Sequence, residues 1–183
     1  MSEVTDISEA QDTDPEALRK ALLDQLRHLV EEVEALRTVV DGLPDDIKNG
    51  RPGPDVLTMK ELYGALATLD DEVRPRRISR LVDEDAPTLA PVDIDAEVRE
   101  AGWNEQALPD ILDQLQAARR RLVEQLEALP PEDWHHTGTL EGEAVTLFTL
   151  VHRMTQDDTE RLRDLGYRLH GAHLSDRDEP LPT

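Results

Sequence analysis

The side chains that could do chemistry are concentrated between His152 and Arg161. If this stretch is helical, His152, Gln156 and Glu160 lie four residues apart on one face, so the imidazole and the carboxylate could bind one metal ion. A solvated helix face is the simpler interpretation of this set. Asp157 and Arg161 are also four residues apart, with the acid nearer the N-terminus, which is the favourable order for an ion pair within a helix.

Three neighbouring residues form a second group of candidates. His135 and His136 directly follow Trp134 in a segment expected to be a turn. Histidine titrates near neutral pH and binds metals, but two adjacent side chains rarely point at the same centre. We interpret Trp134 as an apolar plug that closes one end of the protein, with its indole N–H bonded to the backbone or to water. Cysteine is absent, which excludes thiolate zinc sites and cysteine nucleophiles.

Four segments in which apolar residues recur every three or four positions would have to position these side chains. The expected helices run from Pro15 to about Gly42, from Thr58 to about Leu81, from Asn104 or Pro109 to Ala128, and from Glu141 to His170. No stretch alternates apolar and polar residues, so we expect no strand. The pattern predicts an all-α fold, a four-helix bundle.

The ends and interruptions of these helices have local causes. Asp14 is a typical N-cap ahead of a proline at the first helical position, and Thr58 with Glu61 has the form of a capping box. Pro75 removes a helical hydrogen bond, so we expect a kink or a break there. Residues 83–103 contain prolines and scattered acids and form a long connection.

One domain is expected, spanning residues 15–173. Residues 1–14 hold five acidic residues and no basic one, which predicts a disordered acidic tail. Residues 174–183 are expected to form a flexible C-terminal tail.

The charge balance excludes several classes of partner. The chain has 41 acidic residues against 20 lysines and arginines, a net charge of −21. This charge repels nucleic acid phosphate and anionic lipid. No apolar run approaches the length of a membrane span, and the N-terminus lacks the pattern of a secretion signal. We therefore expect a cytoplasmic protein with neither a nucleic acid nor a membrane as partner.

Two stretches carry a resemblance to a known family. They are DGLPDDIKNGRPGPDVLTMKELYGALATLDDEVRPRRISRLVDEDAP and, later, LEALPPEDW followed by GEAVTLFTLVHRMTQDD. Their order and spacing over about residues 35–170 resemble the DinB/YfiT-like family. The resemblance implies a four-helix bundle, typically dimeric. In many members three histidines, one on the second helix and two on the last, hold a divalent metal that activates a thiol or a water for transferase or hydrolase chemistry.

In this sequence the three ligand positions of the family fall on Ala65, Asp157 and Arg161. Alanine has no donor atom and arginine is a permanent cation, so we expect no metal and no other cofactor. Asp157 and Arg161 are instead expected to pair with each other, either enclosed in the cleft as a substitute for the metal or as an ion pair on the surface. The alternative is a divalent metal, Zn or Ni, held by Asp157 together with Glu160 or His152.

Three functions follow as hypotheses. The first is a divergent DinB/YfiT-like protein that lost the metal site and binds a small molecule in the bundle cleft or assembles as a homodimer. The others are a metal-dependent hydrolase or thiol transferase with the alternative ligands, and an acidic protein-interaction module. The possible cleft residues are Asp157, Arg161, His152, Glu160 and Trp134. The acidic cluster at Asp70, Asp71 and Glu72 is interpreted as surface charge beside Arg74.

Overall fold

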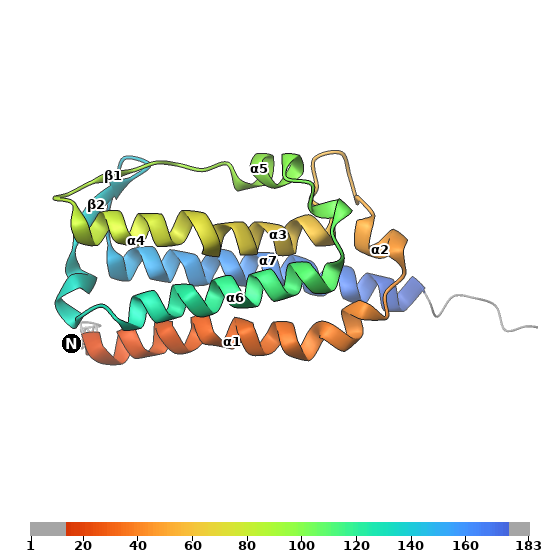
Figure 1. Cartoon of the computed structure of the whole chain (residues 1–183), viewed down its shortest axis with the longest axis horizontal. Helices are drawn as coiled ribbons and strands as arrows, with labels where there is room; N and C mark the ends of the chain where they lie inside the picture. Colours follow the sequence, from red (N-terminus) through yellow and green to blue (C-terminus); the bar gives the residue numbers. More distant parts are fainter. Residues whose placement is uncertain (1–13, 176–183) are drawn as a thin grey trace, which may run out of the picture.

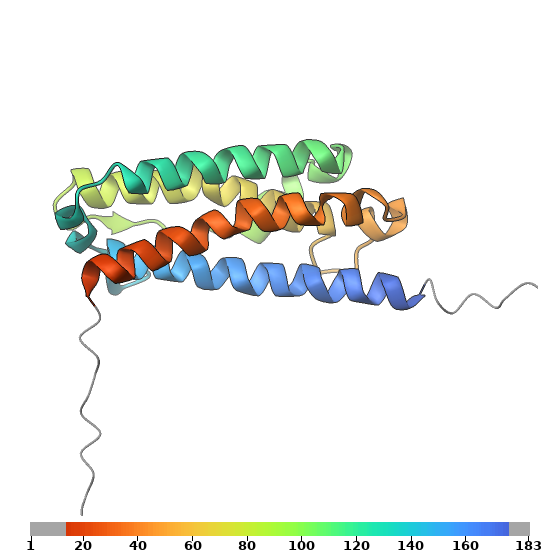
Figure 2. The same ribbon diagram turned by 90° about the horizontal axis from the view of Figure 1, so that it is seen from below.

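Four long helical segments lie along one another in the computed structural model, which describes residues 14–175 (Figure 1). They are α1 (Pro15–Asp41), α3 (Met59–Thr68) continued by α4 (Arg74–Asp83), α6 (Leu108–Glu127) and α7 (Leu147–Ser175). In the view from below, α1 lies between α6 and α7 (Figure 2). The predicted all-α four-helix bundle is confirmed. No helix within residues 14–175 is both long and apolar enough to cross a membrane.

The expected tails fall almost wholly outside the described residues. Asp14 is the exception at the N-terminus, where its side chain accepts a hydrogen bond from the Glu16 backbone N–H at 3.1 Å and caps α1 as predicted. At the other end α7 continues to Ser175, two residues past the expected end of the domain at residue 173.

The second helix of the bundle begins with the predicted capping box. The Glu61 N–H donates to the Thr58 hydroxyl at 3.1 Å, and the Glu61 carboxylate accepts from the Thr58 N–H at 2.8 Å. Two backbone donors that the first turn would leave unpaired are thereby satisfied.

A π-helical turn, η1 (Leu69–Val73), joins α3 to α4 where a kink or break was expected. Pro75 has no N–H to donate to the carbonyl one turn earlier, and the chain adapts by widening the turn. The Arg74 N–H consequently donates to the Leu69 carbonyl, five residues back. The wide turn buries Asp70 between the apolar residues Leu69 and Val73.

A small sheet covers one end of the bundle, and the expectation of no strand is wrong there. It contains β1 (Thr88–Leu89), β2 (Thr137–Leu140) and β3 (Glu143–Thr146), in the order β1-β2-β3. β1 pairs parallel to β2, and β3 pairs antiparallel to it through a two-residue turn. Glu141 and Gly142 have φ of 54° and 82° in this turn, the left-handed conformation that tight hairpins require. Hence α7 begins at Leu147 rather than at Glu141.

The connections contain short helices that the sequence pattern did not predict. The segment after α1 forms α2 (Asp45–Asn49), and the long connection forms α5 (Ile94–Glu100) and the 3₁₀ turn η2 (Trp103–Glu105). Trp103 packs directly on the α3 backbone at Gly64, where an added Cβ would lie 2.5 Å from the indole. Gly64 is therefore required for this close approach.

The apolar core is divided into two clusters along the bundle. One is centred on α3 and the middle of α1, and the other on the N-terminal half of α1, α4 and the start of α7. The first cluster includes Leu29, Val33, Tyr63, Leu66 and Leu115. The second includes Leu26, Ile78, Leu122, Trp134 and Met154.

Two glycine substitutions test this packing in opposite directions. Gly64→Ala should destabilise the protein by about 1 to 3 kcal/mol, because the new methyl group overlaps Trp103. Gly166→Ala in α7 should stabilise it by up to about 1 kcal/mol, because nothing lies within 4 Å of the added Cβ and alanine favours the helix. Urea unfolding of both variants measures the difference, and equal stability of the two would contradict the packing of Trp103 on α3.

Candidate functional site

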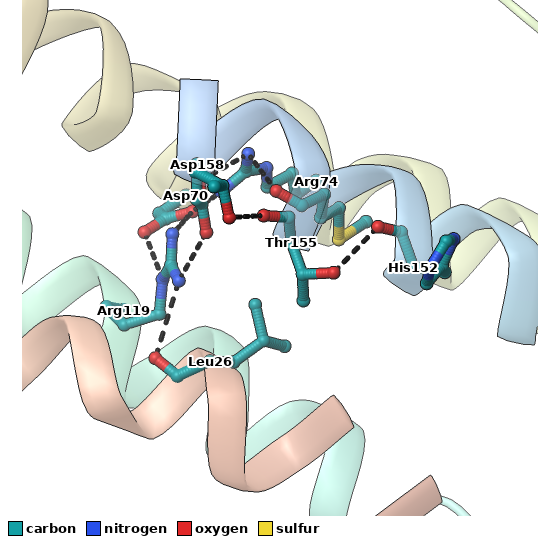
Figure 3. A network of polar contacts seen from close by, with 9 residues as sticks. Leu26, Asp70, Arg74, Arg119, His152, Thr155 and Asp158 are labelled. Carbon is teal, nitrogen blue, oxygen red and sulfur yellow. Dashed lines mark hydrogen bonds and ion pairs between the residues drawn. The ribbon is translucent and has the colours of Figure 1, made fainter. Parts of the chain in front are cut away.

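A ring of four buried charged side chains lies between the two core clusters (Figure 3). Asp70 comes from η1, Arg74 from the start of α4, Arg119 from α6 and Asp158 from α7. Their side chains are between 0% and 8% exposed. Two acids and two bases make the ring neutral, which is the condition under which charges can remain buried.

The hydrogen bonds of the ring form a closed circuit. Arg74 donates from Nη1 to Asp70 Oδ1 at 2.6 Å and from Nη2 to Asp158 Oδ1 at 2.8 Å. Arg119 donates from Nε to Asp70 Oδ2 at 2.6 Å, and its Nη1 lies 2.7 Å from Asp158 Oδ2. Arg119 also reaches the Leu26 carbonyl of α1 at 3.4 Å, so all four long helical segments contribute to the ring.

The electrostatics of the ring favour its charged form. Burial alone would raise the pKa of the Asp158 carboxyl, but the charges and hydrogen bonds of Arg74 and Arg119 outweigh it and hold the pKa below the usual value. Burial likewise opposes the charge of Arg74, and the two aspartates outweigh it and raise its pKa. Because the Asp158 pKa is lowered by folding, its carboxylate stabilises the protein above the pKa of the unfolded chain. That contribution is lost as the pH falls through the folded-state pKa.

The sequence interpretation missed this ring. Asp70 and Arg74 were expected on the surface, which is wrong, and Arg119 and Asp158 were not considered. A signal was present, because each of the four occupies an inward position of its helix. Arg119, for example, lies four residues after Leu115 and three before Leu122, both fully buried. Charges of opposite sign at positions that continue the inward-facing apolar stripes of three helical segments indicate an internal ion-pair network.

A cavity of about 310 Å³ lies beside the ring, between η1, α4, α7 and the β2–β3 turn. Its apolar wall consists of Leu69, Val92, Ile94, Leu140, Leu150 and Met154. Its charged wall consists of Arg74, Arg77, Glu141, Arg153, Asp157 and Arg161. Gln156 completes the lining.

Two of the expected cleft residues, Asp157 and Arg161, line this cavity, and three do not. His152 and Glu160 are exposed on α7 outside the lining. Figure 3 shows His152 well apart from the charged ring. Trp134 is fully buried at the end of the bundle, where its ring centroid lies 5.1 Å from that of Phe148.

Trp134 closes the bundle end, as its sequence position predicted, with one difference. The Arg19 guanidinium lies over its indole at 5.7 Å from the ring centroid. No residue of the described chain accepts a hydrogen bond from its Nε1, so a backbone acceptor, one of the two expected partners, is not found there. The adjacent histidines diverge, as expected: His135 packs edge-on against Phe148, and His136 faces Asp133 at 3.7 Å.

The expected ion pair between Asp157 and Arg161 is wrong. Arg161 instead pairs with Asp95 of α5, with Nη1 at 3.2 Å from Oδ1. Asp157 makes no ion pair with any residue from 14 to 175. It is exposed at the cavity wall, where partial desolvation raises the pKa of its carboxyl. The buried partner of the arginines is the next residue, Asp158.

A second group facing the cavity is unpaired. Arg77 donates from Nη2 to the Ala90 carbonyl at 2.8 Å, but its buried Nε has no acceptor. None of the carboxylates that the structure describes pairs with it. Burial lowers the pKa of Arg77, against the opposing charge of Glu141.

The residues at the family's ligand positions do not fit a divalent metal. Ala65 has no donor atom, is fully buried in the core and does not line the cavity. Arg161 brings a positive charge to the cavity wall and is engaged with Asp95. Across residues 14–175, no group of three or more histidine, cysteine, aspartate or glutamate side chains is arranged to hold a metal ion.

Comparison with known proteins identifies a family and a relative in fold. A sequence profile described as the DinB superfamily matches residues 28–165. A solved structure described as "YfiT from Bacillus subtilis is a probable metal-dependent hydrolase with an unusual four-helix bundle topology" superimposes with a TM-score of 0.62 at 16% identity. The similarity covers 91% of this chain and 94% of that one, and at this identity it shows the shared fold. No curated protein sequence matches significantly.

Neighbouring aspartates on α7 test the ring. Asp158→Ala should cost about 3 to 5 kcal/mol in the free energy of unfolding, because it leaves part of two buried guanidiniums without a partner. Asp157→Ala, the matched control, should cost less than about 1 kcal/mol. Urea unfolding at neutral pH measures both, and Asp158→Asn serves as a milder replacement if the alanine variant does not fold. A larger loss in Asp157→Ala than in Asp158→Ala would contradict the assignment of the ring.

Proposed function

This chain belongs to the DinB superfamily, and we propose that it retains the bundle of that family without the three-histidine metal site and binds a small molecule in the cavity beside the ring. The observation that carries this proposal is the cavity itself. It is walled by Asp157 and Arg161, two of the three positions where the family resemblance places metal ligands. The cavity therefore lies at the level of the bundle where the family does its chemistry, with a different set of side chains.

The chemistry of those side chains supports binding rather than metal catalysis. The Bacillus subtilis relative is described as a probable metal-dependent hydrolase. In this chain Arg161 and the nearby Arg77 and Arg153 bring positive charge to the cavity, which opposes a cation. The apolar wall and the few polar groups are typical of small-molecule sites.

Metal analysis tests the absence of the metal site. Elemental analysis by mass spectrometry should find far less than one metal ion per chain in protein purified without an affinity tag. Added Zn²⁺ or Ni²⁺ should not bind stoichiometrically. A stoichiometric metal that is lost on Asp157→Ala would overturn the proposal, and the metal-dependent hydrolase or transferase hypothesis would replace it.

Two variants, each with a new tryptophan on α7, test whether the ligand binds in the cavity. Gln156→Trp should block the cavity, because Gln156 lines it from an exposed position on α7. His152→Trp, one turn away and outside the lining, is the control. In ligand-observed NMR with a small-molecule extract, compounds that bind the parent should bind His152→Trp and not Gln156→Trp. Equal binding by both variants would contradict the cavity as the site.

We also propose that the protein forms homodimers and acts in the cytoplasm. The dimer is supported by exposed apolar groups on α1, where Leu18 is 37% and Val39 40% exposed. Because each chain carries a net charge of −21, an apolar interface should strengthen with salt. Light scattering at low and high ionic strength should show a dimer fraction that rises with salt and falls on Val39→Glu. A monomer under both conditions would refute the dimer.

A further inference from the structure

The cavity leaves charges of both signs unpaired, which contrasts with the charged ring beside it. In the ring beside it, every carboxylate and guanidinium is matched. At the cavity, neither Arg77 nor Asp157 has an ion-pair partner among residues 14–175. Arg77 is partly buried and its Nε has no acceptor, and the exposed Asp157 lines the same cavity. Burying charge without a partner is costly, so Arg77 lacks an acceptor that a ligand could supply, and the unpaired carboxylate of Asp157 is available to the same ligand.

The two groups together restrict the charge of that ligand. The other arginines of the cavity, Arg74, Arg153 and Arg161, are already paired with carboxylates outside it. A simple anion would therefore pair with Arg77 but would meet the unpaired Asp157 and Glu141 in the same cavity and a protein of net charge −21. A simple cation would pair with Asp157 and leave Arg77 unpaired beside it. A molecule that carries one carboxylate and one ammonium satisfies both groups and has no net charge to be repelled.

The apolar wall restricts the rest of the molecule. Leu69, Leu150 and Met154 line the cavity from η1 and α7. Val92 lines it from just before α5, and Ile94 from the first residue of α5. An aliphatic side chain would remove these surfaces from water, which favours binding. A volume of about 310 Å³ accommodates a molecule of that size.

We propose that the cavity is a binding site for a small zwitterion with an aliphatic side chain, of the apolar α-amino acid class, whose carboxylate pairs with Arg77 and whose ammonium pairs with Asp157. This inference rests on the proposed function and specifies the ligand class of the same cavity. Arg77 and Asp157 act as the two polar contacts that fix orientation, and the leucine, valine, isoleucine and methionine side chains accept the aliphatic group.

Three compounds that differ by one group test the proposal. Leucine is compared by isothermal titration calorimetry with isocaproate, which lacks its amine, and with isopentylamine, which lacks its carboxylate. Leucine should bind at least about tenfold more tightly than either, because each truncated compound leaves one charged group of the cavity unpaired.

Two variants and two matched controls assign the contacts. Arg77→Gln should weaken leucine and isocaproate and leave isopentylamine unchanged, and Asp157→Asn should weaken leucine and isopentylamine and leave isocaproate unchanged. The controls Arg76→Gln and Glu160→Gln remove the same charges at exposed positions that do not line the cavity. They should bind leucine as the parent does, which separates direct pairing from an effect of net charge.

The outcomes separate this inference from the proposed function. Binding of isocaproate or isopentylamine as tight as that of leucine overturns the zwitterion, as does an unchanged leucine affinity in both cavity variants. If leucine shows no saturable binding while extract compounds still bind the parent and not Gln156→Trp, the ligand class is wrong and the proposed function stands. If neither leucine nor any extract compound binds, both fail.

Discussion

The closed ring of two aspartates and two arginines is the constraint on which the rest of the bundle depends. Each of its charges is removed from water and is stable only because the others are present, so the three segments that supply them must meet at one level. An apolar core of leucines tolerates sliding of one helix along another, whereas a ring of directed hydrogen bonds does not. The ring thereby fixes the register of the helices that the two apolar clusters hold together.

The ring also determines what faces the cavity. Arg74 belongs to both, since it pairs with Asp70 and Asp158 and also lines the cavity. Turning Asp158 inward places Asp157 about 100° around α7 from it, on the cavity wall, where it makes no ion pair with the ring arginines. The unpaired state of Asp157 is thus a consequence of the pairing of its neighbour. In this way the same few residues stabilise the bundle and shape the proposed binding site.

Local rules were sufficient for the elements that depend on neighbours in sequence. The cap at Asp14, the capping box at Thr58 and the apolar stripes located the long helices to within a few residues, except at the start of α7. The sheet was not predicted because its strands have only two, four and four residues, too few for an alternating pattern to be recognised. In addition, the two residue pairs that join β1 to β2 are about fifty positions apart in the sequence. Its parallel pairing is visible in no local pattern.

The sequence by itself determined the long helices, the net charge and the family. It also determined which side chains stand at the three positions where the family has its metal ligands. Only the tertiary structure decided which charges are buried and with whom they pair. Three steps of about 3.6 residues from the buried Leu147 reach position 158, so the inward residue is Asp158, yet an i, i+4 rule favoured Asp157 with Arg161. Ion pairs form between side chains on different helices, and their partners are set by packing distances that no local spacing encodes.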